Sequence, residues 1–520
     1  MYIWCKPASA QVFKHTRMWP EDSTALTLHT ARNMTVSGQV CMRDVETAFD
    51  VTGLEVTSLP AGVTAKTYIT DYMVYNDGVP YPDILSTKTS THVAMNATQS
   101  LWFCFTVSED APVGTHTVTV MVKTNLGEYS IDWKLTVYPV TLPAPKDSSF
   151  GHEYFLDTTS IFPKDHPYDK PPCEPFYTHI RYDEGWWALM ANFAKTLAAM
   201  RVNSLNIPVM ALLSDGGSKR ISSTEWELDF GLFDRFVEHF LAHGSFRYLT
   251  ICAVIGAVNG KTMQAIGEDG GVTWLTIFTP ECEAWAKAFY SGIYKHFEEK
   301  GWLPMLQMRL QDEPHSTEYW KWARDLCREC MPGVVCGEPL DTHTVSRALC
   351  GYVDQYIPRI EVYEEGKDYY LERQRAGEQV WCYSCCYPFV MGWMNKFIDM
   401  PPIYSRLMKW ACFTHGITGF LHWGFNYWGI SLYGLHPDAR FKGDGFIVYP
   451  DAEHNSLMLS ARGLNTIDGL QDWELLNLLR KKNPAAANAI TRRVAFGFTD
   501  LHTDPLSLEA ARAEVLTLLC

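Results

Sequence analysis

The pattern of hydrophobic and polar positions changes its character once along the chain, close to residue 140. Before that point, short segments alternate apolar and polar side chains with a period of two, which is typical of strands that bury one face. The clearest segments are 101–107, 115–122 and 129–137, and the turns between them contain glycine, proline or asparagine. Several such strands at short spacing predict a β-sandwich for the N-terminal part of the chain.

Beyond residue 148, stretches with helical spacing of apolar side chains alternate with short apolar runs. The stretches at 187–200 and 232–241 have the helical spacing, and runs such as 202–207 and 248–255 follow them. Strands that alternate with helices over about 300 residues indicate a parallel α/β architecture, and this length suits a (β/α)₈ barrel of the TIM type. No glycine-rich phosphate loop follows an early strand, which argues against a doubly wound nucleotide-binding fold.

These patterns predict three parts of the chain. A proline-rich stretch at 139–145 resists both helix and sheet interior, so we expect a linker there. The predicted parts are an N-terminal β-sandwich domain at 1–143, a (β/α)₈ catalytic barrel at 148–485 and a C-terminal helical extension at 486–520. Within the extension, Leu506–Leu519 is expected to form one amphipathic helix.

Composition and charge exclude two classes of partner. Hydrophobic residues make up 47% of the chain and charged residues 20%, which is ordinary for a globular protein. No apolar run approaches the roughly 20 residues of a membrane span. The formal net charge of -15 argues against a phosphate-binding surface, because proteins that bind nucleic acid need clustered Lys and Arg. We therefore expect neither a membrane nor a nucleic acid as partner. The sequence pattern does not distinguish a monomer from an oligomer.

The N-terminus and the cysteines favour a cytoplasmic protein. Residues 1–16 contain no basic segment followed by an apolar stretch, as a signal peptide would. The 15 cysteines are odd in number and scattered without a framework, which suits a reducing compartment. A secreted chain whose signal had been removed would look the same.

Two adjacent acids, Asp312 and Glu313, stand where the apolar run 302–310 stops. This run is predicted to be a strand, and the catalytic groups of a (β/α)₈ barrel lie at the C-terminal ends of its strands. We expect Pro314 to hold Glu313 in an extended conformation, because the proline ring clashes with an α-conformation there. The pair is a candidate general-acid apparatus. The alternative is a helix cap, in which Asp312 caps a helix at 316–330 and Glu313 favours its positive end.

Aromatic and polar side chains gather at two other predicted strand ends, 381–383 and 422–428. Aromatic faces beside amide and hydroxyl groups suit a sugar ring, which offers apolar C–H faces and a rim of hydroxyls. The candidate substrate-binding residues are Trp381, Tyr383, Trp423, Asn426 and Trp428. Core filling is the alternative for any single tryptophan.

The other notable acids and cysteines are expected to have structural roles rather than roles in a functional site. Glu364 and Glu365 are expected to open a helix as a solvated first turn. Asp468, Asp472 and Glu474 are expected to be capping or surface groups of a late helix, and Asp444 a turn residue. Cys327 and Cys330 have a metal-like spacing, but they fall on the apolar stripe of a helix. No second pair of Cys or His residues with the spacing of zinc ligands accompanies them. We therefore expect no zinc, no other metal and no cofactor.

Five segments in the second part of the chain, in their order, resemble glycoside hydrolase family 123. They are Asp312-Glu313-Pro314, 380–385, 419–428, 443–450 and 467–474. In the first part, 81–85 and the hairpin 101–122 resemble the β-sandwich domain of that family. The resemblance therefore covers nearly the whole chain.

The resemblance implies an activity and a division of roles. Characterised members of the family are exo-acting β-N-acetylgalactosaminidases that use substrate-assisted retention, in which the substrate's own acetamide is the nucleophile. It implies that Glu313 protonates the glycosidic oxygen and then activates water, while Asp312 orients the 2-acetamido group. The expected substrate is a glycan with a terminal β-linked N-acetylgalactosamine or a related N-acetylhexosamine. Glu313 should start protonated, which a dry aromatic pocket would favour.

Two alternatives stay open at this point. One is a barrel glycosidase that acts on a sugar without an acetamide. The other is a catalytically silent carbohydrate-binding protein that keeps the pocket.

Overall fold

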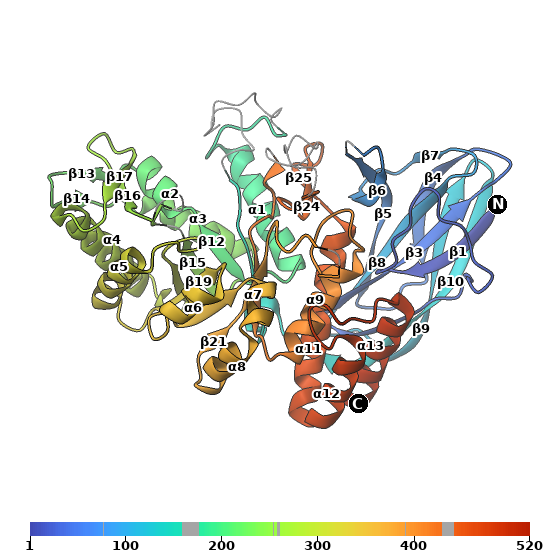
Figure 1. The fold of residues 1–520 in the computed structure, drawn as a ribbon. Coiled ribbons are helices and arrows are strands. Elements are labelled where there is room, and N and C mark those ends of the chain that lie inside the picture. Colours follow the sequence, from blue (N-terminus) through green and yellow to red (C-terminus); the bar gives the residue numbers. More distant parts are fainter. Residues whose placement is uncertain (76, 159–175, 253, 257–259, 391, 429–440) are drawn as a thin grey trace.

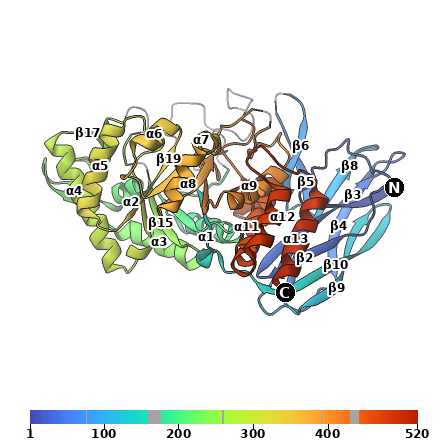
Figure 2. The same ribbon diagram turned by 60° about the horizontal axis from the view of Figure 1, so that its bottom comes forward.

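The computed structural model describes residues 1–75, 77–158, 176–252, 254–256, 260–390, 392–428 and 441–520. Figure 1 shows a β-rich N-terminal part at one end, a mixed α/β part at the other, and C-terminal helices packed between them on one side. Figure 2 shows the same two parts side by side from below.

Two five-stranded sheets form the N-terminal part. One has the order β1 (Tyr2–Pro7), β3 (Met34–Arg43), β8 (Thr98–Val107), β5 (Val63–Val74) and β6 (Pro80–Ser86). The other has the order β2 (Thr27–Arg32), β10 (Gly127–Thr141), β9 (Gly114–Thr124), β4 (Phe49–Thr57) and β7 (Thr91–Val93). Alternate residues of both sheets share one apolar core, in which Phe103 and Phe105 pack edge-on against Trp133. In β9 and β10 the period-two pattern marks one buried face, as expected. In β3 and β8, by contrast, both faces are buried, because the second face of their sheet packs against the core of the other part of the fold.

The second part is built on a parallel sheet that nearly closes on itself. Its strand order is β21 (Gln379–Val380), β20 (Gln355–Pro358), β19 (Val335–Leu340), β18 (Leu306–Arg309), β15 (Tyr248–Cys252), β12 (Ser204–Ile207), β11 (Gly151–Tyr154), β23 (Gly419–His422) and β22 (Cys382–Ser384). Every neighbouring pair is parallel. The first and last strands of this order, β21 and β22, are separated in the chain only by Trp381. The sheet is thus a nearly closed parallel barrel.

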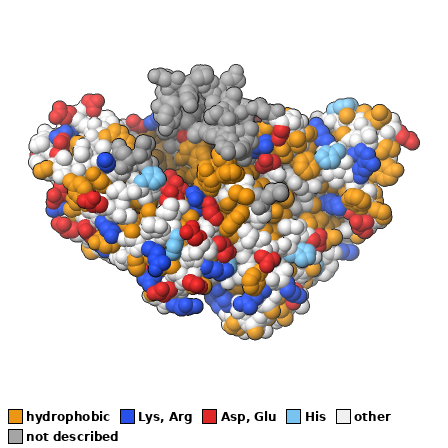
Figure 3. Space-filling view, viewed as in Figure 1, with side chains coloured by type: hydrophobic (Ala, Val, Ile, Leu, Met, Phe, Trp, Pro, Cys, Tyr) orange, Lys and Arg blue, Asp and Glu red, His pale blue; other side chains and the backbone are white. Residues whose placement is uncertain are grey.

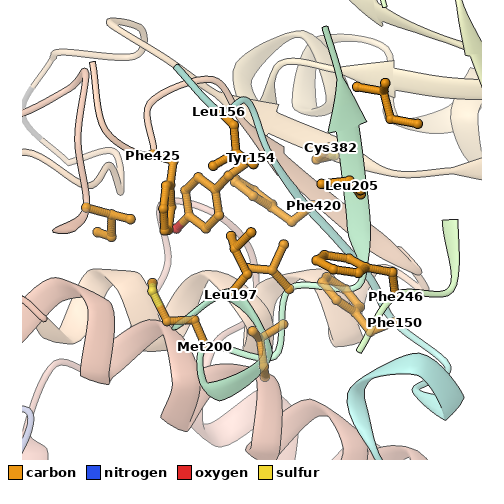
Figure 4. Packing of buried hydrophobic residues seen from close by; sticks show 14 of the residues in the cluster. Phe150, Tyr154, Leu156, Leu197, Met200, Leu205, Phe246, Cys382, Phe420 and Phe425 are labelled. Atoms are coloured by element: carbon orange, nitrogen blue, oxygen red, sulfur yellow. The ribbon is translucent and has the colours of Figure 1, made fainter. Parts of the chain in front are cut away.

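Helices follow the strands and cover the outside of this sheet (Figure 1). They are α1 (Glu184–Ala199), α2 (Val209–Gly216), α3 (Gly231–His243), α4 (Pro280–Glu299), α5 (Thr317–Cys330), α6 (His343–Ala348), α7 (Ile360–Glu365), α8 (Lys367–Arg375), α9 (Ile403–Thr414) and α11 (Ala461–Lys482). Figure 4 shows Leu197 and Met200 at the end of α1 packed beneath Tyr154 of β11 and Phe420 of β23.

Short elements complete the second part. Two-stranded antiparallel hairpins extend from it: β13 (Lys219–Arg220) with β14 (Trp226–Glu227), β16 (Thr262–Ile266) with β17 (Val272–Thr276), and β24 (Val448–Asp451) with β25 (Ser456–Leu459). The 3₁₀ turns η1 (Pro145–Asp147) and η2 (Leu303–Met305) precede β11 and β18. The expectation of a continuous strand from 302 was therefore wrong, since the chain turns at Leu303–Met305 before the strand begins. The run 446–449 was expected in the barrel series, but among the described residues β24 pairs with β25 of its own hairpin and not with the barrel sheet.

The C-terminal helices join the two parts. α12 (Pro484–Val494) and α13 (Pro505–Leu519) follow α11, and α13 confirms the helix expected at 506–519. Figure 2 shows α13 lying beside both α11 and the strands of the N-terminal sheets. Between the parts, Asp83 of β6 accepts hydrogen bonds from Arg462 Nε at 3.0 Å and from the Tyr449 hydroxyl at 2.6 Å, all buried. The two parts are thus held by a desolvated polar contact as well as by apolar packing.

The acids of α11 are buried, which contradicts the expectation that they cap or face solvent. Asp472 accepts from Arg406 at 2.6 Å and from the Trp410 indole at 2.9 Å, and it also pairs with Arg512. Glu474 accepts from the backbone N–H of Ser149 at 2.8 Å. Their partners come from α9, from α13 and from the approach to β11, far away in the sequence, so the local pattern gave no sign of them.

Glu364 and Glu365 were expected to open a helix, but they end α7 instead. Glu364 lies 3.3 Å from the Nε2 atom of His415, so it is not simply a solvated group.

All 14 cysteines within the described residues are free thiols. Among the helices of the described residues, we find none that combines the length and the apolar character needed to cross a bilayer.

Candidate active site

A cavity of about 400 Å³ opens at the C-terminal ends of the barrel strands. Its wall includes Phe155 after β11, Asn206 of β12, Cys252 of β15, Asp312 after β18 and Tyr427 after β23. These residues are far apart in the sequence, and the parallel sheet brings them together because all its strands end on one side. In the space-filling view, acidic and apolar side chains lie next to each other near the middle of the face, beside residues drawn in grey (Figure 3).

Asp312 is the carboxylate of this cavity wall. Its side chain is open to solvent through the cavity, while protein surrounds it on the other sides. Burial, and then the neighbouring carboxylates of Glu313 and Asp341, raise the pKa of Asp312 to about 7. A carboxyl group that holds its proton near neutral pH is suited to proton transfer or to a switch between two hydrogen-bonding states.

Glu313 has a left-handed backbone, with φ of 49°. The expected extended conformation was therefore wrong. A proline disfavours a right-handed α-conformation in the residue before it, and here the chain avoids that conformation by turning to the left-handed region. Non-glycine residues at positive φ are strained and cluster at functional sites. The turn directs the Glu313 carboxylate to Tyr383 of β22, and the Tyr383 hydroxyl donates a hydrogen bond to the Oε1 atom of Glu313.

A buried acid of the next strand, Glu338 of β19, holds the backbone just before the pair. Its Oε2 atom accepts the N–H of Leu310 at 3.0 Å and the indole N–H of Trp320 at 2.7 Å. Its Oε1 atom accepts the N–H of Gln311 at 3.2 Å. Burial raises the pKa of Glu338 to about 8, although these donors and Arg309 favour the charged form. Glu338 therefore fixes the direction in which Asp312 leaves the strand.

Arg309, the last residue of β18, also lines the cavity. It lies within 2.7 Å of Glu153 of β11, and both side chains are buried. Its guanidinium also lies 5.6 Å from the ring centre of Trp381. An ion pair at this depth is strongly sensitive to the loss of either partner, since the remaining charge would be buried alone.

The helix-cap alternative for Asp312 is wrong. Helix α5 begins at Thr317, and the residue at its N-cap is Ser316, four positions after Asp312. The expected cap bond from Asp312 to the first turn is not formed, because the turn at Glu313 separates the acid from the helix.

Two of the predicted aromatic residues border the site. Trp423 is half-buried after β23, and its indole N–H donates to Asp444 at 2.8 Å. Its ring lies 5.1 Å from that of Tyr427, which lines the cavity. Asp444 is buried and supports Trp423, which goes beyond the turn role expected for it. Tyr383 is buried and reaches Glu313, as described above.

The other three predicted binding residues lie in the core, so we assign them structural roles. Trp381 is 1% exposed and fills the barrel interior, where it packs on Gly151 and Gly419. Asn426 is 0% exposed, and its amide exchanges hydrogen bonds with the backbone of Asp157 at 2.9 and 2.7 Å. Trp428 is 1% exposed and donates to the Val448 carbonyl at 2.8 Å. The sequence pattern could not separate these side chains from exposed ones.

Several site residues were missed by the sequence analysis. Asn206 and Phe155 stand at strand ends, but a single amide or phenylalanine is too common to be singled out. Tyr427 lies within the aromatic run 422–428, where it was not separated from its neighbours. Glu338 gave no signal at all, because its partners Leu310, Gln311 and Trp320 belong to another strand and helix.

Within the described residues, no three His, Cys, Asp or Glu side chains are grouped so that they could hold a metal ion. Cys327 is buried on α5, as the apolar stripe suggested.

Comparison with known proteins identifies the family. The family model for the glycoside hydrolase 123 catalytic domain matches residues 176–479. A family 123 glycoside hydrolase from Clostridium perfringens, studied for glycolipid glycan hydrolysis, has a similar structure with a TM-score of 0.75, 14% identity, and coverage of 100% of this chain and 98% of that one. A termite-gut family 10 xylanase with a bacterial Ig-like domain reaches a TM-score of only 0.36, at 8% identity over 87% of this chain and 100% of that one. No curated protein matches. Because the family model matches more than half of the sequence, the chain belongs to glycoside hydrolase family 123.

Proposed function

We propose that this glycoside hydrolase is a retaining exo-enzyme that releases terminal β-linked N-acetylgalactosamine, or a related N-acetylhexosamine, by substrate-assisted catalysis. The observation that carries the proposal is the contrast between Asp312 and Glu313. Asp312 faces the cavity, and Glu313, the next residue, is turned to Tyr383. Two adjacent carboxyl groups in different surroundings suit two different tasks on one substrate.

The fold supports the proposal through the position of the pair. We count β21 and β22 as one strand interrupted at Trp381, which gives eight parallel strands and a (β/α)₈ barrel. The corresponding domains are 1–143, a β-sandwich, 148–485, the catalytic barrel, and 486–520, the helical extension. The pair then stands at the C-terminal end of a barrel strand, where enzymes of this fold carry their catalytic groups.

In the first step, the acetamide oxygen of the substrate attacks C1 of the sugar while the bond from C1 to the glycosidic oxygen breaks. Glu313 gives its proton to the departing oxygen, so the leaving group departs as an alcohol. Asp312 accepts a hydrogen bond from the acetamide N–H and stabilises the positive charge of the cyclic intermediate. An intramolecular nucleophile is effective because its entropy of approach is already lost on binding.

In the second step, water attacks C1 from the side that the leaving group has vacated. Glu313 takes a proton from this water as it adds, and the ring of the intermediate opens to restore the acetamide. Two displacements at C1 return the original configuration, so the product retains the β-anomer. The first step leaves Glu313 ionised, and the second restores its proton, so the complete cycle ends with Glu313 protonated and Asp312 ionised.

This mechanism needs one proton on the pair. Because burial and the neighbouring carboxylates raise the pKa of Asp312 to about 7, Asp312 holds a proton below about pH 7 in the absence of substrate. The acetamide N–H of a bound substrate favours the ionised form of Asp312, and the proton that Asp312 gives up is the one that Glu313 delivers in the first step.

Hydrolysis of three aryl glycosides tests the proposal against its alternatives. We expect turnover of aryl β-N-acetylgalactosaminide, less of the N-acetylglucosaminide, and very little of the β-galactoside, which lacks the acetamide. Comparable turnover of the galactoside would favour a glycosidase without acetamide participation. Turnover of none of them, with retained binding of the sugar, would favour a silent carbohydrate-binding protein.

The role of Glu313 is tested by substitution with glutamine. Glu313→Gln should abolish turnover of substrates with poor leaving groups and spare those whose leaving group needs no protonation. Full activity on poor leaving groups would place the acid at another residue.

A further inference from the structure

The hairpin of β16 and β17 stands beside the cavity, on the side of the barrel where the catalytic pair lies. It follows β15, and Gln264 of β16 lines the cavity together with Asp312. In the antiparallel register, Gln264 is opposite Trp274 of β17. Directly opposed residues of an antiparallel pair have their side chains on the same face of the hairpin. The side chain of Trp274 is therefore on the face that turns to the cavity.

The other face of this hairpin is the buried one. Met263 and Leu275, which oppose each other in the register, are both buried against the second part of the fold. On the cavity face, by contrast, Trp274 is 49% exposed. Because Gln264 on the same face lines the cavity, the exposed indole extends the cavity wall and is a surface available to a ligand that reaches out of the cavity.

The Trp274 ring is tied to the catalytic segment through one glycine. A Cβ atom placed at Gly256 would lie only 3.1 Å from ring atom Cζ3 of Trp274, so the indole rests against that backbone. The carbonyl of Gly256 accepts a hydrogen bond from Gln311 Nε2 at 3.3 Å. Gln311 immediately precedes Asp312. The indole is thus connected through the backbone of Gly256 to the side chain of Gln311, the residue that precedes Asp312.

We propose that Trp274 is the stacking platform for the second sugar of the glycan, the one joined to the terminal residue through the bond that is cleaved. The inference rests on the proposed exo-hydrolysis of a terminal N-acetylhexosamine. An exo-enzyme encloses the terminal sugar in its pocket, so the rest of the glycan must extend out of the pocket over its edge. The apolar C–H face of a sugar ring packs on an open indole, and the hydroxyl rim stays in contact with water.

The test compares Trp274→Ala with the wild type on two kinds of ligand. One is an oligosaccharide with terminal β-linked N-acetylgalactosamine, measured by kcat/KM. The other is a monosaccharide thiazoline that mimics the cyclic intermediate and has no second sugar, measured by its Kd. We expect kcat/KM on the oligosaccharide to fall about 10-fold, mainly through KM, because stacking is lost equally in ground and transition state. The Kd of the thiazoline should be unchanged.

Two further variants serve as controls. Trp274→Phe keeps an aromatic face and should recover most of the kcat/KM on the oligosaccharide. Trp19→Ala removes a tryptophan that is 63% exposed in the N-terminal part, and it should change neither measurement.

Two outcomes would overturn the proposal. Equal losses for the oligosaccharide and the thiazoline would mean that Trp274 only supports the pocket, and no loss for either would mean that it binds nothing. Failure of the proposed function is distinguishable, because then the wild type itself would neither bind the thiazoline nor release N-acetylgalactosamine.

Discussion

The hydroxyl of Tyr383 donates a hydrogen bond to the carboxylate of Glu313, and this bond joins β22 to the segment that follows β18. The two residues are brought together across the barrel by the left-handed turn at Glu313. Tyr383 is buried, and the nearby charge of Glu313 adds to burial in raising its pKa well above the ordinary value for tyrosine. The phenol therefore stays protonated and acts as a fixed donor to Glu313.

Tyr383→Phe removes this donor without changing the shape of the pocket. A donor to a carboxylate favours its ionised form, so its loss should move the pH at which activity falls to a higher value. We expect kcat to fall about 10-fold, the value of one hydrogen bond to a charged group. Tyr370→Phe is the matched control, because its hydroxyl, also buried, bonds to Ser346 outside the cavity wall. An unchanged pH profile in Tyr383→Phe would mean that the bond has no part in proton transfer.

The pH dependence of the wild type follows from the proton on Asp312, which the proposed mechanism uses. Burial and the acidic neighbours raise the pKa of Asp312 to about 7. As the pH rises through about 7, the pair loses that proton and kcat/KM should fall. A pH series of kcat/KM on an aryl N-acetylgalactosaminide measures this limb. Activity that rises through pH 7 and stays high at pH 9 would contradict the assignment.

Asp312→Asn separates catalysis from stability. Activity should fall strongly, because an amide cannot stabilise the charged intermediate. The raised pKa means that the folded state holds the Asp312 proton more tightly than the unfolded chain does, so ionised Asp312 opposes folding above pH 7 and not below pH 4. The variant should therefore gain about 1 kcal/mol in free energy of unfolding at pH 8, a value reduced by solvent screening, and nothing near pH 4. Denaturant unfolding at both pH values measures this. A loss of stability at both would indicate a structural role.

Glu338→Gln tests the hydrogen bonds by which Glu338 holds the backbone just before Asp312. An amide nitrogen in place of one oxygen faces the N–H groups of Gln311 or Leu310, which should destabilise the fold by about 1–3 kcal/mol. Displacement of Asp312 should lower kcat by up to about 100-fold, since small misplacements of catalytic groups are costly. Glu474→Gln is the control, because Glu474 is also buried and accepts a backbone N–H, from Ser149, far from the cavity. An equal loss of kcat in both variants would mean that Glu338 only stabilises the fold and does not position Asp312.

Periodicity was enough to predict the layers of the fold. Alternation in β9 and β10 marks a sheet with one buried face, and helical spacing marks α1 and α3. It was not enough to find β11, the four-residue strand that neighbours both β12 and β23, because so short a run has no measurable period. The burial of charged side chains could not be predicted from the sequence either. Asp472 is buried because Arg406 and Arg512, which belong to other helices, pair with it, and these partners are distant in the sequence.

The candidate site was predictable in part for a physical reason. Chain order places Asp312 and Glu313 after a strand, and parallel strands end on one side, so the location of the pair follows from the fold class. Which aromatic residues face the cavity does not follow from it. Trp381 and Trp423 both stand at strand ends, yet one fills the barrel and the other is half-exposed. Their orientation depends on where each strand stops, and a shift of one residue reverses it.

The central claim is that the substrate's acetamide is the nucleophile, and a series of aryl β-N-acetylgalactosaminides with successively fluorinated acetyl groups tests it most directly. Fluorine withdraws electron density from the acetamide oxygen and leaves the leaving group unchanged. The proposed mechanism predicts that kcat/KM falls with each fluorine added, from acetyl to trifluoroacetyl. A kcat/KM that is independent of fluorination would contradict it and would show that another group attacks C1.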